Sequence, residues 1–309
     1  MPLGIDPKVD FAFKLMFGSP EHPAVTIHFL NAILRLPAPV TDVEILNPTH
    51  GKDRADDKLV VLDILAQDSL GRRFNVEMQT TRQVDLPRRL LYYSSLTYAR
   101  QIGEGQSYRD LRPVISICVL DDVIFDRQAY PRYHHSFRLR CDQEDLVFTN
   151  DFEFHILELP KFAPSSDNIA SLPAEEKWLY LLRHAESMNS EQLAAMLVDP
   201  PFEEAIGVLE MISKNPEDLQ FYEARLKFLR DQQSLIESAK QEVQNARAEG
   251  REEGRQEGME KGLLAGKVQT LQGLLGEAEA SNQDLLRLPL DELSALVQSL
   301  QSRLRSRDA

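Results

Sequence analysis

Two carboxylates in the segment from residue 59 to residue 79, Asp63 and Glu77, have the spacing needed to hold a metal ion together. The segment predicts a β-hairpin, because apolar residues alternate along both arms and Asp-Ser-Leu-Gly at 68–71 is typical of a turn. A turn centred near Leu70 places Asp63 opposite Glu77, with Cβ atoms about 4.5 to 5.5 Å apart. Like charges at that distance destabilise a sheet, so we expect a divalent cation to compensate.

Phosphodiester hydrolysis is the reaction that such a pair of carboxylates suits. A hard cation bound by carboxylate oxygens withdraws charge from the scissile phosphate and makes a bound water nucleophilic. Gln79 lies two residues after Glu77 in the same predicted strand, so its side chain is expected on the same face. Its amide can hydrogen-bond the attacking water or a phosphate oxygen, but it supplies no positive charge.

The order of Asp63, Glu77 and Gln79 resembles the core motif of PD-(D/E)XK nucleases, with Gln in the position of the usual Lys. This version is similar to the Rpn-type recombination-promoting nuclease and putative transposase family. Over roughly the first half of the chain, the flanking segments agree in the family's order, and so does the tail: DPKVDFAFKLMFG, LPRRLLYYSSLTYARQIGEGQSY, PVISICVL, ELPKF and EGREEGRQEG. The ordered flanks make the resemblance specific, since the short motif alone occurs often by chance.

The resemblance implies a Mg²⁺-dependent endodeoxyribonuclease, a hydrolase linked to recombination or transposition, with Mn²⁺ or Ca²⁺ as alternative ions. It implies that Asp63, Glu77 and the backbone carbonyl of Met78 hold the metal, and that Gln79 and Asp10 are further catalytic residues. DNA is the implied partner. The candidate DNA-binding residues are Lys14, Arg82, Arg88, Arg89 and Tyr93.

Several of these residues have simpler interpretations. Asp10 and Lys14 are four residues apart on a predicted helix, so they can form an ordinary surface ion pair. Arg89 and Tyr93 have the same spacing, and Tyr93 can instead pack in the core. Because Gln79 replaces a lysine, two other functions stay open. One is a catalytically weak nucleic-acid-binding or oligomeric scaffold protein that retains the nuclease fold, and the other is a coiled-coil scaffold whose N-terminal domain binds protein.

The charge of the chain argues against a protein that coats nucleic acid through bulk electrostatics. The net charge is −14, from 35 Lys plus Arg against 49 Asp plus Glu. Any contact with DNA must therefore be local. Between Arg72 and Arg112 there are eight arginines against four acids, which gives a basic patch beside the hairpin. A solvated helix face is an equally good interpretation of any single arginine in it.

The remaining polar residues point to no second site. Cys118 and Cys141 lack the spacing of a zinc site or the number for a predictable disulfide, so both are expected to be reduced thiols. His134-His135 is interpreted as a surface pair, and the three aspartates at 53, 56 and 57 as a solvated turn. We find neither a signal sequence nor an apolar run of about 18 residues, so we expect a cytoplasmic protein without membrane spans.

Periodicity and capping residues predict an α/β fold in residues 1–165, a nuclease-like core with a mixed sheet flanked by helices. Helices are expected from Asp6, near 22–36 and from Asp85, and strands at 40–46, 59–66, 74–79, 114–120, 136–140 and 152–159. An all-helical region follows at 166–220. Residues 221–275 predict a long helix or coiled coil, and residues 276–309 an amphipathic helical end that docks or dimerises.

Within the long helix a glycine recurs every four residues, at positions 250, 254, 258, 262 and 266. Each glycine costs about 1 kcal/mol relative to alanine in a helix interior. Close packing of a second helix against the stripe would offset that cost, and a repeat longer than 3.6 residues predicts right-handed wrapping. We therefore expect a homo-oligomer formed through the C-terminal helices. A partly frayed, low-complexity tether is the alternative interpretation.

Overall fold

The computed structural model describes residues 1–46, 49–50, 60–61, 63–80 and 85–307. The chain forms two compact units, Met1–Arg230 and Asp231–Ala309. The longest helix, α7 (Pro216–Leu275), begins in the first unit and continues into the second.

The first unit is built on a six-stranded sheet with the order β1-β4-β5-β6-β8-β7. Strands β5, β6 and β8 run parallel, and the other neighbouring pairs are antiparallel. The expected mixed sheet is therefore confirmed. The strands are β1 (Glu44–Leu46), β4 (Ile64–Gln67), β5 (Arg73–Gln79), β6 (Val114–Leu120), β7 (His134–Arg140) and β8 (Val147–Glu158).

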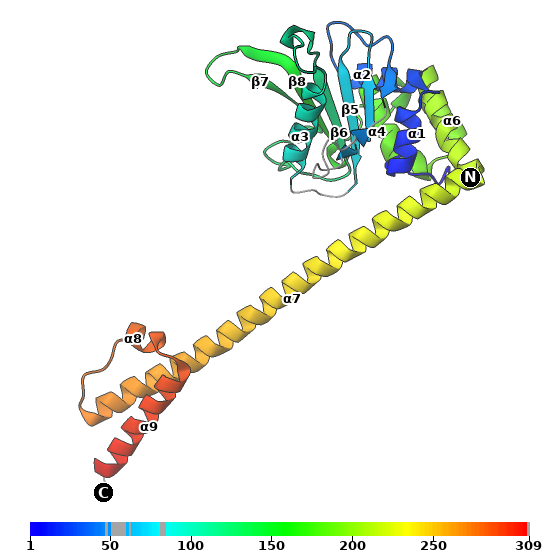
Figure 1. Cartoon of the computed structure of the whole chain (residues 1–309). Helices are drawn as coiled ribbons and strands as arrows, with labels where there is room; N and C mark the ends of the chain where they lie inside the picture. The colour runs from blue at the N-terminus through cyan, green and yellow to red at the C-terminus, as the bar shows by residue number, and fades with distance from the viewer. Residues whose placement is uncertain (47–48, 51–59, 62, 81–84, 308–309) are drawn as a thin grey trace. The chain divides into compact units, whose positions relative to one another are not determined.

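Helices cover both faces of this sheet (Figure 1). On one face, α3 (Leu86–Ala99) packs Leu86 and Leu90 against Cys118 and Leu120 of β6. The larger core lies on the other face, between the sheet and α1 (Asp10–Gly18), α2 (Pro23–Ile33), α4 (Ala174–His184), α5 (Ser190–Met196) and α6 (Pro200–Lys214). Short 3-10 helices lie at Tyr108–Asp110, Leu159–Lys161, Ile169–Ser171 and Ala185–Ser187.

The helices after residue 165 share this larger core with the N-terminal helices. The ring of Trp178, on α4, lies 5.2 Å from that of Phe17, 5.8 Å from that of Phe29 and 4.4 Å from that of Phe202, measured between centroids. Trp178 is fully buried. Burial of a side chain of this size stabilises the packing of α4 and α6 on α1 and α2 by several kcal/mol. The division of the chain at residue 165 remains a prediction about domains.

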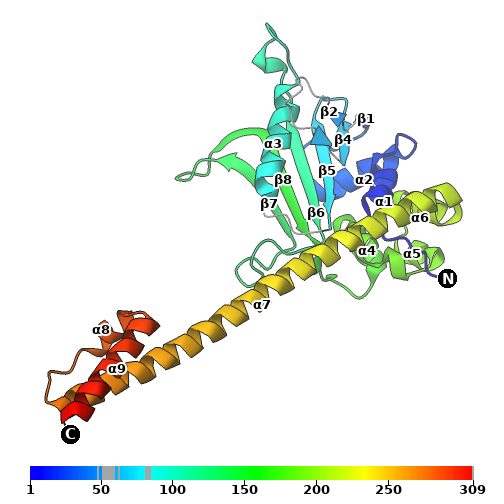
Figure 2. The same ribbon diagram turned by 60° about the horizontal axis from the view of Figure 1, so that its bottom comes forward.

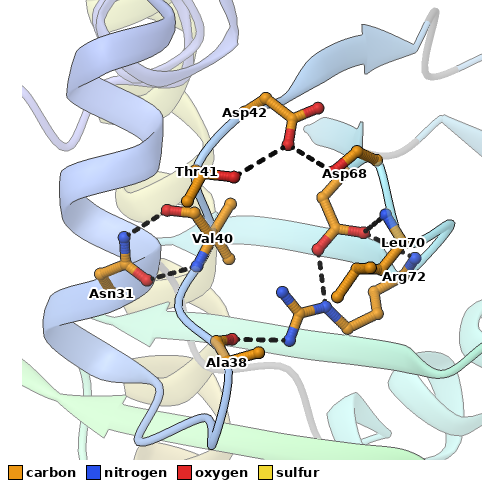
Figure 3. Close-up of polar contacts among 9 residues, drawn as sticks. Asn31, Ala38, Val40, Thr41, Asp42, Asp68, Leu70 and Arg72 are labelled. Atoms are coloured by element: carbon orange, nitrogen blue, oxygen red, sulfur yellow. Dashed lines mark hydrogen bonds and ion pairs between the residues drawn. The ribbon is translucent and has the colours of Figure 1, made fainter.

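The turn between β4 and β5 has the chemistry expected from its residues (Figure 3). The amide of Asp68 donates to the carbonyl of Arg72 at 3.1 Å, and the amide of Gly71 donates to the carbonyl of Asp68 at 2.9 Å. The Asp68 carboxylate also accepts from the amides of Leu70 and Arg72. Gly71 has φ +76°, which a residue with a side chain rarely adopts. These bonds fix the register of the hairpin.

A hydrogen bond also joins this turn to the segment that precedes β1. The guanidinium of Arg72 donates to the carbonyl of Ala38 at 2.9 Å. The amide side chain of Asn31, on α2, donates to the carbonyl of Val40 and accepts from its amide (Figure 3). The hairpin is therefore held in a defined position relative to α2.

The first arm of the hairpin differs from the expected continuous strand at 59–66. Strand β3 (Val60–Val61) pairs with β2 (Thr49–His50) in a separate two-stranded sheet, and β4 begins only at Ile64. Asp63 lies in the bend between them. Its carboxylate accepts the hydrogen bond of the Met78 amide at 3.0 Å. The Asp63 side chain thus accepts a hydrogen bond that a backbone carbonyl of a continuing strand would otherwise accept. The strand can therefore be interrupted at this point.

Two other elements begin later than their sequence signals. Helix α1 starts at Asp10 rather than near Asp6, because the Asp6 carboxylate accepts from the amide of Lys8 and holds that segment in a turn. The amide of Asp6 donates to the hydroxyl of Tyr222, on α7. Strand β1 starts at Glu44 rather than at Val40, whose amide and carbonyl bond to a side chain instead of to a neighbouring strand.

The second unit has its own small core. The end of α7 and the two helices that follow, α8 (Asn282–Arg287) and α9 (Leu290–Arg307), lie side by side (Figure 2). Their buried side chains are Ala265, Val268, Leu285, Leu293, Val297 and Leu300. The amphipathic end of the chain thus docks on α7. None of the described helices combines the length and the apolar character needed to cross a bilayer.

Candidate active site

The register of the hairpin places Asp63 and Glu77 together. Ile64 pairs with Val76, so the same register brings Asp63, the residue before β4, opposite Glu77 on β5. On its other side, Glu77 pairs with Cys118 of β6. Glu77 is 2% exposed and Asp63 is partly buried. Glu77 therefore lies on the sheet face that α3 covers, and Asp63 lies opposite it at the end of the hairpin.

Asp63 is held by one main-chain donor and one cation. Its Oδ2 accepts from the amide of Met78 at 3.0 Å, and its Oδ1 lies 3.4 Å from Nζ of Lys14, on α1. Burial raises the pKa of the Asp63 carboxyl, and the positive charge of Lys14 opposes that shift only in part. A bound cation would favour the ionised form that this environment disfavours.

Glu77 is more deeply buried and less completely bonded. Its Oε1 accepts from the side-chain amide of Asn75 at 3.0 Å. Its Oε2 has no hydrogen-bond partner among the residues that the structure describes, and the nearest cation is Arg89, with Nη2 at 3.7 Å. Burial raises the pKa of Glu77, and the negative charge of Asp63 raises it further. Burying a carboxylate oxygen without a hydrogen-bond donor costs folding free energy. A metal ion or a water bound to Oε2 would offset that cost.

The residues present can supply ligands of the right kind for a hard cation. Within the described part of the chain, no group of three or more His, Cys, Asp or Glu side chains is arranged to hold a metal ion. A site here would therefore consist of the Asp63 and Glu77 carboxylates, a main-chain carbonyl and water. Such all-oxygen ligand sets, with several waters retained, are typical of Mg²⁺.

Two cations flank this pair of carboxylates. Lys14 is about one-third exposed and contacts Asp63. The guanidinium of Arg89 lies over the ring of Tyr93, 5.6 Å from its centroid, and faces Glu77. Tyr93 is buried, so its ring packs against the guanidinium of Arg89 and is not accessible to a ligand. Positive charge is thus present beside the carboxylates although position 79 holds a glutamine.

The sequence did not reveal Arg225, which belongs to the same cluster. The expected ion pair between Asp10 and Lys14 does not form. Asp10 accepts instead from Nε and Nη2 of Arg225, on α7, at 2.9 and 2.6 Å, while Lys14 turns to Asp63. The negative charges of Asp10 and Asp63 raise the pKa of Arg225 together with its hydrogen bonds to Asp10. No local pattern could have indicated this contact, because its partners are 215 residues apart.

The other predicted site residues have varied positions. Gln79 ends β5, pairs with Leu120 and accepts from the amide of Asp121 through its carbonyl at 2.9 Å. The Met78 side chain is buried in the larger core, and only its main chain faces Asp63. Arg88 is exposed on α3. Arg82 and the aspartates at 53, 56 and 57 lie outside the described residues.

Part of the predicted basic patch makes contacts within the protein. Arg72 pairs with Asp68 at 2.6 Å, and Arg73 donates to the carbonyl of Thr97. Both cysteines are free thiols, as expected. Burial raises the pKa of Cys118 far above its usual value, and the charges of Glu77 and Asp63 add to that shift.

The interpretation of His134-His135 as a surface pair is wrong. Both side chains are 19% exposed, and His134 hydrogen-bonds to Glu175 and to His155. The partners of His134 come from α4 and from the next strand, β8. The sequence around the two histidines does not indicate these contacts.

Comparison with known proteins gave one matching family. A family model described as PD-(D/E)XK nuclease family transposase matches residues 7–239, which confirms the resemblance that the sequence motifs carried. No curated protein and no solved structure matches the chain.

Proposed function

Because the chain belongs to the PD-(D/E)XK nuclease transposase family, we propose that it is a Mg²⁺-dependent DNA endonuclease that serves recombination or transposition. Nucleases of this superfamily generally use divalent metals. The observation that carries the proposal is the opposition of Asp63, which is partly buried, and Glu77, which is buried, two carboxyls with raised pKa values beside Lys14. Free carboxylates would destabilise this arrangement, and bound Mg²⁺ would relieve it.

Each residue has a defined task in this proposal. Asp63, Glu77 and the carbonyl of Met78 would hold the ion, and a cation bound there would supply Lewis-acid chemistry to the phosphate and to a water. Lys14 contacts a phosphate oxygen. It supplies the positive charge that the superfamily's lysine would provide at the position of Gln79. Gln79 orients the attacking water through its amide. Asp10, which accepts hydrogen bonds from Arg225, is an additional acidic residue at the edge of the site.

The proposed DNA-binding surface joins Lys14 of α1 to the arginines at the start of α3. Arg88 is exposed and Arg89 is partly exposed, so both can reach a phosphate backbone next to Glu77. Tyr93 takes part by holding Arg89, and Arg82 is the remaining candidate. A local cationic surface of this kind is needed because the chain as a whole is acidic.

Self-association through α7 is part of the same proposal. A Cβ added at Gly250, Gly254, Gly258, Gly262 or Gly266 meets no atom within 4 Å. Several apolar side chains of the helix are also exposed, among them Leu235, Val243, Met259 and Leu263. A second copy packed along the helix would bury such side chains, and its close approach at the glycine stripe would offset the low helix propensity of the glycines. We place the protein in the cytoplasm, where its two free thiols would stay reduced.

Metal-dependent nicking of supercoiled plasmid tests the proposal directly. Asp63→Asn and Glu77→Gln should each abolish cleavage and weaken Mn²⁺ binding measured by calorimetry. Asp110→Asn, which changes an exposed carboxylate in a short 3-10 helix, is the matched control and should cleave normally. Wild-type cleavage rates in both site variants would refute the metal assignment.

The rival function is a nucleic-acid-binding scaffold that keeps the nuclease fold, and Gln79 is the observation that favours it. It would show DNA binding and self-association without cleavage in Mg²⁺, Mn²⁺ or Ca²⁺. The same plasmid assay, run beside a binding assay, separates the two functions.

A further inference from the structure

A pocket on the other face of the sheet gathers charged side chains that the proposed nuclease site does not use. Glu77, Cys118 and Ile156 are register partners in one row across the sheet, so His155, the residue before Ile156, points to the opposite face. There it lines a pocket of about 220 Å³ formed by β7, β8 and the end of α2.

A chain of hydrogen bonds runs along the wall of this pocket. His134 Nδ1 lies 2.7 Å from Oε1 of Glu175, and its Nε2 lies 2.8 Å from Nδ1 of His155. His155 Nε2 lies 3.0 Å from Oε1 of Glu153, and Arg138 donates to the same oxygen at 2.5 Å. The network thus links α4 to β7 and β8.

Proton counting gives the charge of the two rings. The three hydrogen bonds along them each need one N–H, and two neutral imidazoles have only two. With both carboxylates ionised, the pair therefore carries one additional proton. Burial disfavours the charged form of the His155 ring and lowers its pKa. Although burial opposes it, hydrogen bonds from His155 and Arg138 lower the pKa of Glu153, so this carboxylate is ionised.

Two arginines complete the lining without belonging to this network. Arg35 and Arg132 line the pocket, and neither has a hydrogen-bond or ion-pair partner among the residues that the structure describes. The three arginines of the lining, Arg35, Arg132 and Arg138, and the additional proton of the histidine pair face two carboxylates, Glu153 and Glu175. The pocket therefore has a local surplus of positive charge in a chain whose net charge is −14.

We propose that this pocket binds a phosphate-class dianion, with Arg35 and Arg132 as its principal contacts. Guanidinium groups match tetrahedral oxyanions through paired N–H donors, and two unpaired ones converge on this pocket. Its volume suits one phosphate group and excludes a duplex. The dianion is either free inorganic phosphate or the terminal phosphomonoester of a nucleotide strand. This proposal is independent of cleavage at Asp63 and Glu77.

Calorimetric titration of the full-length protein with sodium sulfate and with inorganic phosphate, at constant ionic strength, tests the site. Arg35→Ala and Arg132→Ala should each weaken binding of both ions by about tenfold or more, since each removes a charge-assisted contact. Arg140→Ala removes an exposed arginine at the end of β7, outside the pocket, and is the control. Melting temperatures should stay unchanged, because neither pocket arginine has a hydrogen-bond or ion-pair partner in the part of the folded chain that the structure describes.

Binding that is absent in the wild type, or weakened equally by Arg140→Ala, would overturn the site. A short single strand with a 5′-phosphate, compared with the same strand carrying a 5′-hydroxyl, distinguishes the two sources of the dianion. A preference for the phosphorylated strand over inorganic phosphate assigns the site to strand ends, and equal affinity assigns it to free phosphate. Equal binding of the hydroxyl strand, lost in both arginine variants, would refute a dianion site.

Discussion

Arg225 donates hydrogen bonds to both carboxylate oxygens of Asp10, and this bidentate pair joins the beginning of α7 to α1 beside Asp63. The neighbouring residues strengthen the junction. The ring of Phe221 stacks on that of Phe11 with centroids 6.0 Å apart, and the guanidinium of Arg225 lies over the ring of Phe228. The helix that carries the glycine stripe therefore begins at the edge of the proposed active site.

We predict that Arg225→Ala shifts the pH dependence of cleavage. Loss of this positive charge raises the pKa of Asp63, so protons compete with the metal up to a higher pH. The acid limb of the pH–rate profile should move up by less than about one unit. Because Arg225 is partly exposed, the free energy of unfolding should fall by no more than about 1 kcal/mol. Lys227→Ala, on the same helix, is the control, and an equal shift there would exclude a specific role.

We predict that Glu77→Gln makes the metal-free protein more stable at neutral pH. The raised pKa of Glu77 means that ionisation opposes folding, so the wild type loses stability as the pH rises through that pKa. The variant stays neutral and avoids the loss. A gain of about 1 kcal/mol would raise Tm by about 2–4 °C for a unit of this size. The difference should shrink at pH 4, where the wild-type carboxyl is protonated, and a difference that instead grows there would contradict the sign.

We predict that Gln79→Lys keeps cleavage and that Gln79→Ala slows it by up to about 100-fold. Lysine is the residue that the wider superfamily has at this position, and it can also orient water or phosphate. Lys14→Gln should slow cleavage as well, and adding Gln79→Lys to it should restore part of the rate. An inactive Gln79→Lys variant that still binds metal would show that the charge of Lys14 already fills the position and that the role of Gln79 is different.

We predict that replacing Gly254, Gly258 and Gly262 by Leu reduces the mass of the assembly. Leucine raises intrinsic helicity but blocks close approach of a second helix, so the interface and tether interpretations require opposite results. Light scattering at equal protein concentration should show the smaller mass, whereas a tether would keep its mass and gain helical circular dichroism. Leu at Gln256 and Glu260, on the side of the helix away from the stripe, is the control.

Local sequence patterns were sufficient for the hairpin because its turn is determined by nearby residues. Asp68 and Gly71 define the turn, and the turn defines the register that opposes Asp63 and Glu77. The carboxylate pair could therefore be predicted from 21 consecutive residues. Helix positions followed from proline and glycine signals in the same way, with shifts of a few residues at their starts.

The rest of the site depends on contacts between distant segments, which no local pattern encodes. Arg225 reaches Asp10 across 215 residues, and Glu175 reaches His134 across 41. The break between β3 and β4 arises because the Asp63 side chain binds a main-chain amide of another strand. Such interactions override strand periodicity only once the tertiary structure has formed.

The position of Trp178 in the N-terminal core has a consequence for synthesis of the chain. Helices α1 and α2 leave the ribosome long before Trp178, Phe202 and Tyr222, the residues that close over them. Until about residue 222 has emerged, the apolar faces of the nascent chain have no cover and would attract chaperones. A fragment that ends at residue 165 should accordingly aggregate, however complete its catalytic hairpin is.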